Sequence, residues 1–286
     1  MLDINTICIV GGDRRQAILG RLLSAGGKAV SYFALEKLGE AQPDFASLRF
    51  AAAKCGAVIL PAPLTRDGKT LGTPLSDLQI TLGEEFGRAL SGKVVFCANK
   101  ELLMKLCAPK DAVVFDYLAD ETLAAKNAAL TAEGALAAAI NASDTAIFGS
   151  RCLVAGCGRI GKLLAHRLSA LGADVTVSAR RESDLAMIRA FGLKAAETGA
   201  LASSGEQYDF IFNTIPAPVF GEKELLATAR GVVIDLASKP GGVDLEACRH
   251  LGINGFSAPG LPGKTAPETA ARIIRDTIYR IMEEYP

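Results

Sequence analysis

The stretch VAGCGRIGKLLA, residues 154–165, decides the fold of this chain. It joins an apolar run with strand character, CLVA (152–155), to a helical pattern. Its glycines have the GxGxxG spacing, in which Gly156 permits a tight turn, Gly158 lets a diphosphate approach the backbone and Gly161 lets the helix pack closely. We therefore predict a βαβ unit that binds a dinucleotide, with the diphosphate at the N-terminus of the helix.

The motif begins past the midpoint of the 286 residues, so another domain must precede it. Short apolar runs alternate with helical patterns in both halves of the chain, as in parallel sheets with crossover helices. This pattern predicts an α/β fold, with two doubly wound parallel-sheet (Rossmann-like) domains joined by helices. The expected strands are 6–10, 28–33, 56–60, 93–98 and 112–116 in the first half, and 152–155, 174–179, 209–213, 231–237 and 253–258 in the second.

Two helical segments complete the predicted organisation. The alanine-rich segment 119–143 has no strand signal, and alanine is the best helix former. Residues 266–284 place isoleucines at helical intervals, which gives an apolar stripe that must be covered. We expect a flavodoxin-like or Rossmann-like substrate domain over 1–118, a helical connector over 119–147, a dinucleotide-binding Rossmann domain over 148–262, and a C-terminal helix within 263–286 that packs back toward the first domain.

The composition excludes several classes of protein. Lys plus Arg equals Asp plus Glu at 31 each and no basic run occurs, so we expect no binding to nucleic acid. No apolar stretch approaches the roughly 20 residues that span a bilayer, and the N-terminal MLDINTICIV lacks the pattern of a signal peptide. The seven cysteines are scattered and never form CxxC, which is typical of core residues in a reducing compartment. We expect a cytoplasmic protein.

The end of the second strand of the βαβ unit favours one cofactor. Sites for NAD usually place Asp or Glu about 20 residues after the glycine turn, where the carboxylate binds the ribose 2′-hydroxyl. Here the sequence is VSARRES (177–183), with no acid at the strand end. Arg180 and Arg181 can bind a 2′-phosphate, and the Ser178 hydroxyl can add a hydrogen bond. We predict NADP as the cofactor, the alternative being that the arginines form only a solvated face.

Two further strand ends lie at the same edge of the predicted sheet. FNTIPAP (212–218) and DLASKPGG (235–242) follow apolar strands, and open α/β sheets bind ligands at the carboxyl ends of their strands. Asn213 and Thr214 can hydrogen-bond a cofactor ribose or amide, or serve ordinary loop structure. Lys239 is a candidate for binding a substrate carboxylate or for proton transfer, or it is a solvated lysine.

The first half and the connector supply other candidates. GGDRRQ (11–16) lacks the third glycine of a dinucleotide turn, and Arg14 beside a helix N-terminus would suit a substrate carboxylate. TAEG (131–134) is expected to interrupt the alanine helix. Gly134 costs about 1 kcal/mol relative to alanine, which indicates close approach by a ligand or another helix. Glu133 is either a catalytic acid or base or a solvated residue.

The sequence lacks, in suitable positions, the residues that catalysis by histidine, by a metal ion or by a serine nucleophile would require. His166 and His250 lie in helical patterns away from strand ends, so neither is placed as a catalytic base. The sequence has no cluster of metal ligands, so we expect no metal site, and it has no GxSxG nucleophile motif. Hydride transfer, in which the cofactor carries the hard chemistry, fits what remains.

Seven motifs are spread nearly from end to end of the chain: GGDRRQ, TAEG, FGS (148–150), VAGCGRIGKLLA, FNTIPA, DLASKPGG and APGLPGKTAPETA (258–270). This set resembles the A subunit of bacterial dipicolinate synthase, the oxidoreductase of endospore formers. The resemblance implies NADP-dependent oxidation of dihydrodipicolinate, or of its hydroxylated tetrahydro precursor, to pyridine-2,6-dicarboxylate. It also implies a partner, a flavoprotein-like B subunit, and a location in the mother cell of a sporulating bacterium.

The resemblance also assigns residues. It implies that Asp235 to Lys239 and Ala258 to Lys264 close over the substrate, a dicarboxylate that Arg14, Thr131, Lys239 and Lys264 would help to bind. The chain departs from it at Phe148, where the resemblance suggests histidine, so no proton relay is expected there. The residues implied for the cofactor are Gly156, Gly158, Arg159, Ile160 and Gly161 at the diphosphate, and Asn213, Thr214, Ile215, Pro216, Asp235 and Ala237 toward the ribose and nicotinamide.

The sequence leaves the base and two other functions open. Aromatisation removes a hydride and a proton, so one cofactor and one base suffice. Glu133 or a neutral Lys239 can be that base, the lysine only if burial lowers its pKa. The alternatives are a 2-hydroxy-acid or shikimate-type dehydrogenase, and a regulatory protein that binds NADP without catalysis. A homo-oligomer is compatible with each of them.

Overall fold

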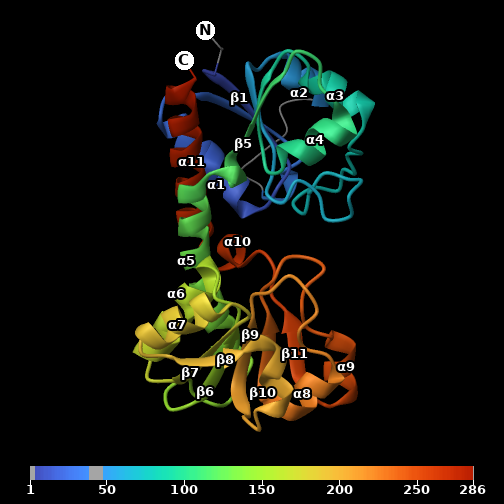
Figure 1. Cartoon of the computed structure of the whole chain (residues 1–286). Helices are drawn as coiled ribbons and strands as arrows, with labels where there is room; N and C mark the ends of the chain where they lie inside the picture. Colours follow the sequence, from blue (N-terminus) through green and yellow to red (C-terminus); the bar gives the residue numbers. More distant parts are fainter. Residues whose placement is uncertain (1–3, 39–47, 286) are drawn as a thin grey trace. The chain divides into compact units, whose positions relative to one another are not determined.

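The computed structural model describes residues 4–38 and 48–285. The chain divides into two compact units, each built around one parallel sheet (Figure 1). Unit 1 comprises Met1–Lys126 and Ala266–Pro286, and unit 2 comprises Asn127–Thr265. The expected α/β fold with two Rossmann-like domains is confirmed.

Unit 1 has a five-stranded sheet in the order β2-β1-β3-β4-β5, in which all neighbours are parallel. This is the flavodoxin-like, doubly wound order. The strands are β1 (Thr6–Val10), β2 (Ala29–Phe33), β3 (Ala57–Ile59), β4 (Val94–Cys97) and β5 (Val113–Asp116). The helices are α1 (Arg14–Ala25), α2 (Leu48–Ala53), α3 (Glu84–Leu90), α4 (Lys100–Cys107) and α11 (Pro267–Glu284), with 3-10 turns η1 (Glu36–Leu38) and η2 (Tyr117–Ala119).

Helices cover both faces of this sheet. The helices α1 and α11 lie side by side on one face, and α2, α3 and α4 lie on the other (Figure 1). The apolar stripe of α11 is buried at Ile274 and Ile278, and α1 ends at Gly26, where a side chain would overlap the Tyr279 hydroxyl. The C-terminal helix therefore completes the core of unit 1.

Unit 2 has a six-stranded parallel sheet in the order β11-β10-β9-β6-β7-β8. Its first strand, β6, lies between β7 and β9, so the order in which the strands are added to the sheet reverses at β6. This strand order is typical of dinucleotide-binding domains. The strands are β6 (Arg151–Ala155), β7 (Asp174–Ala179), β8 (Lys194–Glu197), β9 (Tyr208–Asn213), β10 (Ala229–Asp235) and β11 (Asn254–Ser257). The helices are α5 (Glu121–Asn141), which begins in unit 1 and crosses the boundary at Lys126, α6 (Arg159–Ala170), α7 (Glu182–Ala190), α8 (Glu222–Thr228), α9 (Leu245–His250) and α10 (Leu261–Thr265), with the 3-10 turn η3 (Thr198–Ser203).

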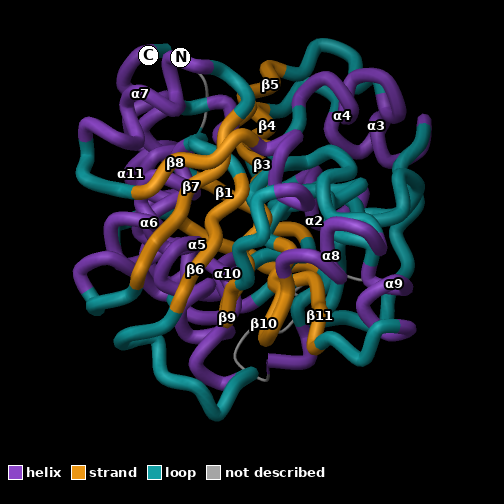
Figure 2. Tube along the Cα trace, turned by 60° about the horizontal axis from the view of Figure 1, so that its bottom comes forward, coloured by secondary structure: helices purple, strands orange, loops and turns teal. Residues whose placement is uncertain are grey.

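Within each unit, the strands lie side by side in a twisted sheet, drawn in orange in Figure 2. In unit 2, side chains of α5, α6, α7 and α10 form one core cluster with the sheet, and η3, α8 and α9 contribute to the cluster on the opposite face. Successive buried residues of a strand point into opposite clusters: Val154 lies in the cluster with α5 and α6, and Leu153 lies in the cluster with α8 and α9. Unit 2 is thus doubly wound, with a core cluster on each face of its sheet.

The structure corrects one expectation about α5. The TAEG stretch does not interrupt this helix, which runs continuously through Gly134. A Cβ at Gly134 would lie 2.8 Å from Leu261 Cβ and 3.0 Å from Thr265 Oγ1, both in α10. The glycine therefore serves the close approach of another helix, which was one of the two explanations that the sequence allowed.

Candidate functional site

A pocket of about 570 Å³ lies at the carboxyl ends of β6, β7 and β9 in unit 2. Ligand pockets commonly have volumes of about 300–1,000 Å³, and doubly wound sheets bind ligands where the strand order reverses. The lining comes from the glycine turn, the end of β7 with the start of α7, the start of η3 and the segment after β9. The lining residues are Gly156, Cys157, Gly158, Ala179, Arg180, Arg181, Asp184, Thr198, Thr214, Ile215 and Pro216.

The three glycines of the turn have different structural roles. Gly156 has a φ of +103°, a conformation that disfavours any other residue. A Cβ at Gly161 would overlap the carbonyl oxygen of Gly156, so this glycine allows the helix to start against the turn. A Cβ at Gly158 would meet nothing within 4 Å. The space in front of Gly158 is open, as the approach of a diphosphate requires.

The first turn of α6 is available to an anion. Gly158 is its N-cap and supplies no side-chain hydrogen bond to the helix. Arg159 and Ile160 are the first residues of this helix, as expected for the residues beside a diphosphate. Backbone N–H groups at a helix N-terminus, with the helix dipole behind them, are suited to phosphate. The residues present therefore fit the diphosphate of a dinucleotide.

Thr214 fastens the segment after β9 to the glycine turn. Its hydroxyl and its backbone N–H donate to the carbonyl oxygen of Ala155, at 2.8 and 2.9 Å. The next two residues, Ile215 and Pro216, line the pocket. Thr214, Ile215 and Pro216 all line this pocket, and their contact with a cofactor stays a prediction.

Asn213 and Asp235 do not lie on the pocket, in contrast to the expectation from sequence. Both are buried, and Asn213 Nδ2 donates to Asp235 Oδ1 at 2.9 Å. The Asp235 carboxylate also accepts from the N–H groups of Ala237, Gly242 and Val243. The polar groups of Asn213 and Asp235 are thus hydrogen-bonded within the protein, where they stabilise the loop after β10. Ala237, in the same loop, is half-buried.

Ser178 also requires a correction. It was expected to hydrogen-bond a 2′-phosphate, but it is fully buried and its hydroxyl accepts from Thr198 Oγ1 at 3.2 Å. Thr198, at the start of η3, lines the pocket in its place. The sequence carries little signal for Thr198 because the preceding strand β8, KAAE, lacks β-branched and aromatic residues and was not predicted.

The two arginines after β7 differ in their surroundings. Arg181 forms an ion pair with Asp184, with Nε 2.8 Å from Oδ2. Arg180 lines the pocket, is exposed, and makes no hydrogen bond or ion pair with any residue within 4–38 and 48–285. Asp184 was missed from the sequence, although its place three residues after Arg181 in a helix is a recognisable pairing signal.

Cys157, between Gly156 and Gly158, also lines the pocket and was not predicted as a site residue. It is half-buried, whereas the other six cysteines are buried. Burial raises the pKa of its thiol, and nearby Lys162 opposes the shift. The thiol is therefore protonated at neutral pH and adds no negative charge beside the expected diphosphate.

The candidates for catalysis and substrate binding lie outside this pocket. Glu133 is on the surface of α5, 3.5 Å from Arg167 Nη2 of α6, and Thr131 donates within the helix to Asn127 O. Lys239 and Lys264 are exposed, the first in the loop after β10 and the second in α10. The burial on which a neutral Lys239 depended is therefore absent within unit 2.

Arg14 begins α1 in unit 1 and is exposed. Its neighbour Arg15 is buried, pairs with Asp13 and donates to the carbonyl oxygen of Ala62. Arg15 thus has a structural role, and Arg14 is the arginine of this turn that remains accessible. His166 and His250 are exposed, as is Phe148, which lies against Gly172.

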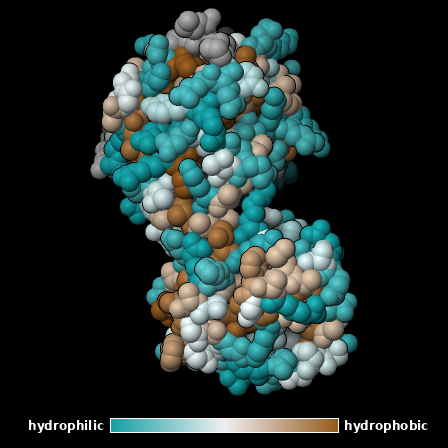
Figure 3. Space-filling view, turned by 60° about the vertical axis from the view of Figure 1, so that its left-hand side comes forward, coloured by the Kyte–Doolittle hydropathy of each residue, from teal (hydrophilic) through white to brown (hydrophobic). Residues whose placement is uncertain are grey.

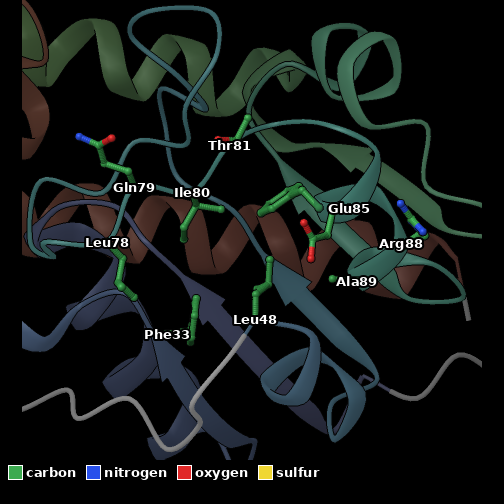
Figure 4. A pocket seen from close by; sticks show the side chains of 10 residues that line it. Phe33, Leu48, Leu78, Gln79, Ile80, Thr81, Glu85, Arg88 and Ala89 are labelled. Atoms are coloured by element: carbon green, nitrogen blue, oxygen red, sulfur yellow. The ribbon is translucent and has the colours of Figure 1, made fainter.

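Unit 1 contains a pocket of about 610 Å³ between β2, α3 and the segment before α3. Figure 4 shows Phe33, Leu78 and Ile80 directed into it, with Glu85 and Arg88 at its edge. None of the sequence-predicted site residues is among its described lining residues. The pocket in unit 2, which is lined by the predicted glycine turn and by Arg180, is therefore the better candidate.

Among the described helices, none combines the length and apolarity needed to cross a membrane. On the face shown in Figure 3, hydrophilic and apolar side chains are interspersed.

The comparisons with known proteins identify the family. Residues 6–118 match the family model for the N-terminal domain of the dipicolinate synthase A subunit, and residues 152–218 match that of ketopantoate reductase PanE/ApbA. The A subunit of dipicolinate synthase from Bacillus subtilis (strain 168) is 30% identical over 292 residues, which cover 99% of this chain and 98% of that protein. This chain belongs to the family of dipicolinate synthase A subunits.

Solved structures agree with this assignment. The crystal structure of the A subunit of dipicolinate synthase from Bacillus halodurans is 32% identical, covers 98% of both chains and gives a TM-score of 0.83. A transhydrogenase from Sinorhizobium meliloti, 14% identical, matches 97% of this chain and 92% of its own with a TM-score of 0.66, a likeness of fold. The resemblance to the A subunit of dipicolinate synthase is confirmed, and the fold is one that NAD(P)-dependent dehydrogenases share.

Proposed function

We propose that this member of the family of dipicolinate synthase A subunits oxidises dihydrodipicolinate, or its hydroxylated tetrahydro precursor, to dipicolinate with NADP. The observation that carries the proposal is the pocket of unit 2, where an open glycine turn lies beside the accessible Arg180. A diphosphate would occupy the start of α6, and a 2′-phosphate would meet the guanidinium of Arg180. Family membership supports the substrate.

The chemistry requires little from the protein beyond binding, orientation and one base. Oxidation of the dihydropyridine ring to the aromatic ring removes one hydride and one proton, and the hydroxylated precursor loses a water in addition. NADP, when bound, accepts the hydride. Thr214 holds the segment that contributes Ile215 and Pro216 to the pocket, so the nicotinamide end would rest against a fixed wall.

We propose that Lys239 contacts the substrate and that Glu133 does not act as the base. Lys239 lies in the loop that the buried Asp235 carboxylate organises, at the carboxyl end of β10. Glu133 lies on α5 and is paired with Arg167 of α6. Arg14, Thr131 and Lys264 remain proposed ligands of the substrate carboxylates.

Replacement of Lys239 separates its role in turnover from a role in folding. Because Lys239 is exposed, Lys239→Ala is expected to retain the melting temperature and the affinity for NADPH. Loss of a charged hydrogen bond to a substrate carboxylate is expected to lower kcat/KM by about 10- to 100-fold. The matched control is Lys223→Ala, an exposed lysine of α8. Turnover of Lys239→Ala at the wild-type rate would exclude this lysine.

The function is tested by the absorbance of NADPH at 340 nm. The purified chain receives freshly generated dihydrodipicolinate precursor with NADP or NAD, by itself and together with the B subunit of dipicolinate synthase, the partner that we propose. Reduction of NADP by the chain alone is the expected result. Activity only with the B subunit would place the chemistry in the complex, and no reduction in any arm would refute the proposal.

A further inference from the structure

The pocket of unit 2 contains a carboxylate beside the two arginines that follow β7. Asp184, in the first turn of α7, lines the pocket together with Arg180 and Arg181 at the end of β7. In dinucleotide sites, a carboxylate in this region accepts a hydrogen bond from the ribose 2′-hydroxyl and so favours NAD. The same carboxylate would repel the 2′-phosphate of NADP. The selectivity of the pocket therefore depends on what neutralises Asp184.

Arg181 engages both oxygens of this carboxylate. Its Nε lies 2.8 Å from Oδ2 and its Nη2 lies 3.1 Å from Oδ1. Hydrogen bonding to Arg181 lowers the pKa of Asp184, and hydrogen bonding to Asp184 raises the pKa of Arg181. Both groups are therefore charged at neutral pH, and the planar guanidinium fits the carboxylate in the two-point geometry that arginine favours.

Arg180 is the neighbouring guanidinium without such a partner. It lines the same pocket and forms no hydrogen bond or ion pair with the described part of the chain. The side chain of Arg181 is 77% exposed and that of Asp184 is 23% exposed, so the arginine of this pair is the more accessible partner. The two arginines are thus not equivalent ligands.

We propose that Arg181 sets the preference for NADP indirectly, by neutralising Asp184, and that Arg180 is the arginine that contacts the 2′-phosphate. The inference rests on the proposed use of NADP in this pocket. With the pair intact, the three side chains leave the single net positive charge of Arg180. Without Arg181, the charges of Arg180 and Asp184 cancel, and a free carboxylate faces the ribose.

A double-mutant cycle tests this division of roles. Equilibrium titrations with NADPH and NADH, followed by nucleotide fluorescence, give the affinity ratio for wild type, Arg181→Ala, Asp184→Asn and the double variant. Arg181→Ala is expected to reduce the preference for NADPH by about tenfold or more, the size of a charged hydrogen-bond effect. The double variant is expected to regain the wild-type ratio within about threefold, because the carboxylate is gone as well.

A direct contact between Arg181 and the phosphate gives a different result. In that case the double variant keeps the low ratio of Arg181→Ala, and the inference is overturned. Arg180→Ala is expected to lose the preference for NADPH over NADH, whether it is made alone or combined with Asp184→Asn. An unchanged ratio in Arg180→Ala would also overturn the assignment.

Two further measurements separate this inference from general effects. Arg189→Ala is the matched control, since Arg189 pairs with Glu182 at 2.9 Å on the same helix and does not line the cofactor pocket. Its ratio is expected to equal that of wild type, and an equal loss would attribute the effect to the helix. A wild-type chain that binds neither nucleotide would refute the proposed cofactor, whereas NADPH binding with no effect of Arg181→Ala would refute only this inference.

Discussion

Gly158 and Gly161 lie three residues apart in one turn, yet a methyl group at each has a different consequence. At Gly158 it would point into open space, and at Gly161 it would overlap the carbonyl oxygen of Gly156. We therefore expect Gly158→Ala to keep the wild-type melting temperature and to lose most of its affinity for NADPH. Gly161→Ala is expected to destabilise unit 2 by about 1–3 kcal/mol, the usual cost of overpacking.

Thermal melting and NADPH titration of both variants check this contrast. Tight nucleotide binding by Gly158→Ala would mean that the diphosphate lies elsewhere. A stable Gly161→Ala would show that the turn can move away from the helix.

The buried carboxylate of Asp235 supports the loop that contains Lys239. It accepts four hydrogen bonds, one from Asn213 and three from backbone N–H groups, and is 3% exposed. Asp235→Ala leaves these donors unpaired, so we expect a loss of about 3 kcal/mol or more in the free energy of unfolding. Urea denaturation followed by circular dichroism measures it.

The matched control for Asp235→Ala is Asp244→Ala. Asp244 caps α9 from a more exposed position, and the loss of such a cap costs about 1 kcal/mol. Equal losses for the two variants would contradict the special role of the buried carboxylate.

At the level of single residues, the sequence predicted the backbone roles better than the side-chain roles. The expected functions of Gly156 and Gly161 follow from local geometry, and the structure contains that geometry. Ser178 and Asn213 were expected on the pocket but are buried. Which side of a strand end faces a ligand depends on the neighbouring strands and loops, and a single sequence does not contain those contacts.

Gly134 in the helix α5 shows whether close packing or helix propensity has the larger effect on stability. Alanine is a better helix former than glycine by about 1 kcal/mol, so Gly134→Ala would stabilise an isolated helix. Here the new Cβ would lie 2.8 Å from Leu261 Cβ, and α10 would have to shift. We expect a net loss of about 1 kcal/mol in the free energy of unfolding, since overpacking exceeds the gain in propensity. A more stable variant in urea would contradict this.

Strands with an apolar, β-branched pattern were predictable even when they are short, and one strand without that pattern was not. The expected strands correspond to β1 to β7 and β9 to β11 within one or two residues at each end. The edge strand β8 was not predicted, because its four residues, KAAE, have a composition typical of a helix or a loop. The 3-10 turn that follows it brings Thr198 to the pocket, so the missed strand also concealed a lining residue.

At the scale of the whole molecule, only one of the two glycine turns is suited to a dinucleotide. In unit 1, Asp13 occupies the place of the middle glycine and caps α1 by accepting from the Arg15 N–H. Gln16 occupies the place of the third glycine, lies against Gly12 and donates to the carbonyl oxygen of Leu60. The turn of unit 1 is filled by its own side chains, so we expect one NADP per chain.

The site of NADP binding is seen directly in a crystal structure of the chain with this cofactor. We predict one cofactor in unit 2, with its diphosphate at Gly158 and the start of α6, its 2′-phosphate on Arg180, and the pair of Arg181 and Asp184 intact. A cofactor bound to unit 1, or one in unit 2 whose 2′-phosphate is held by Arg181 with Asp184 displaced, would contradict this prediction.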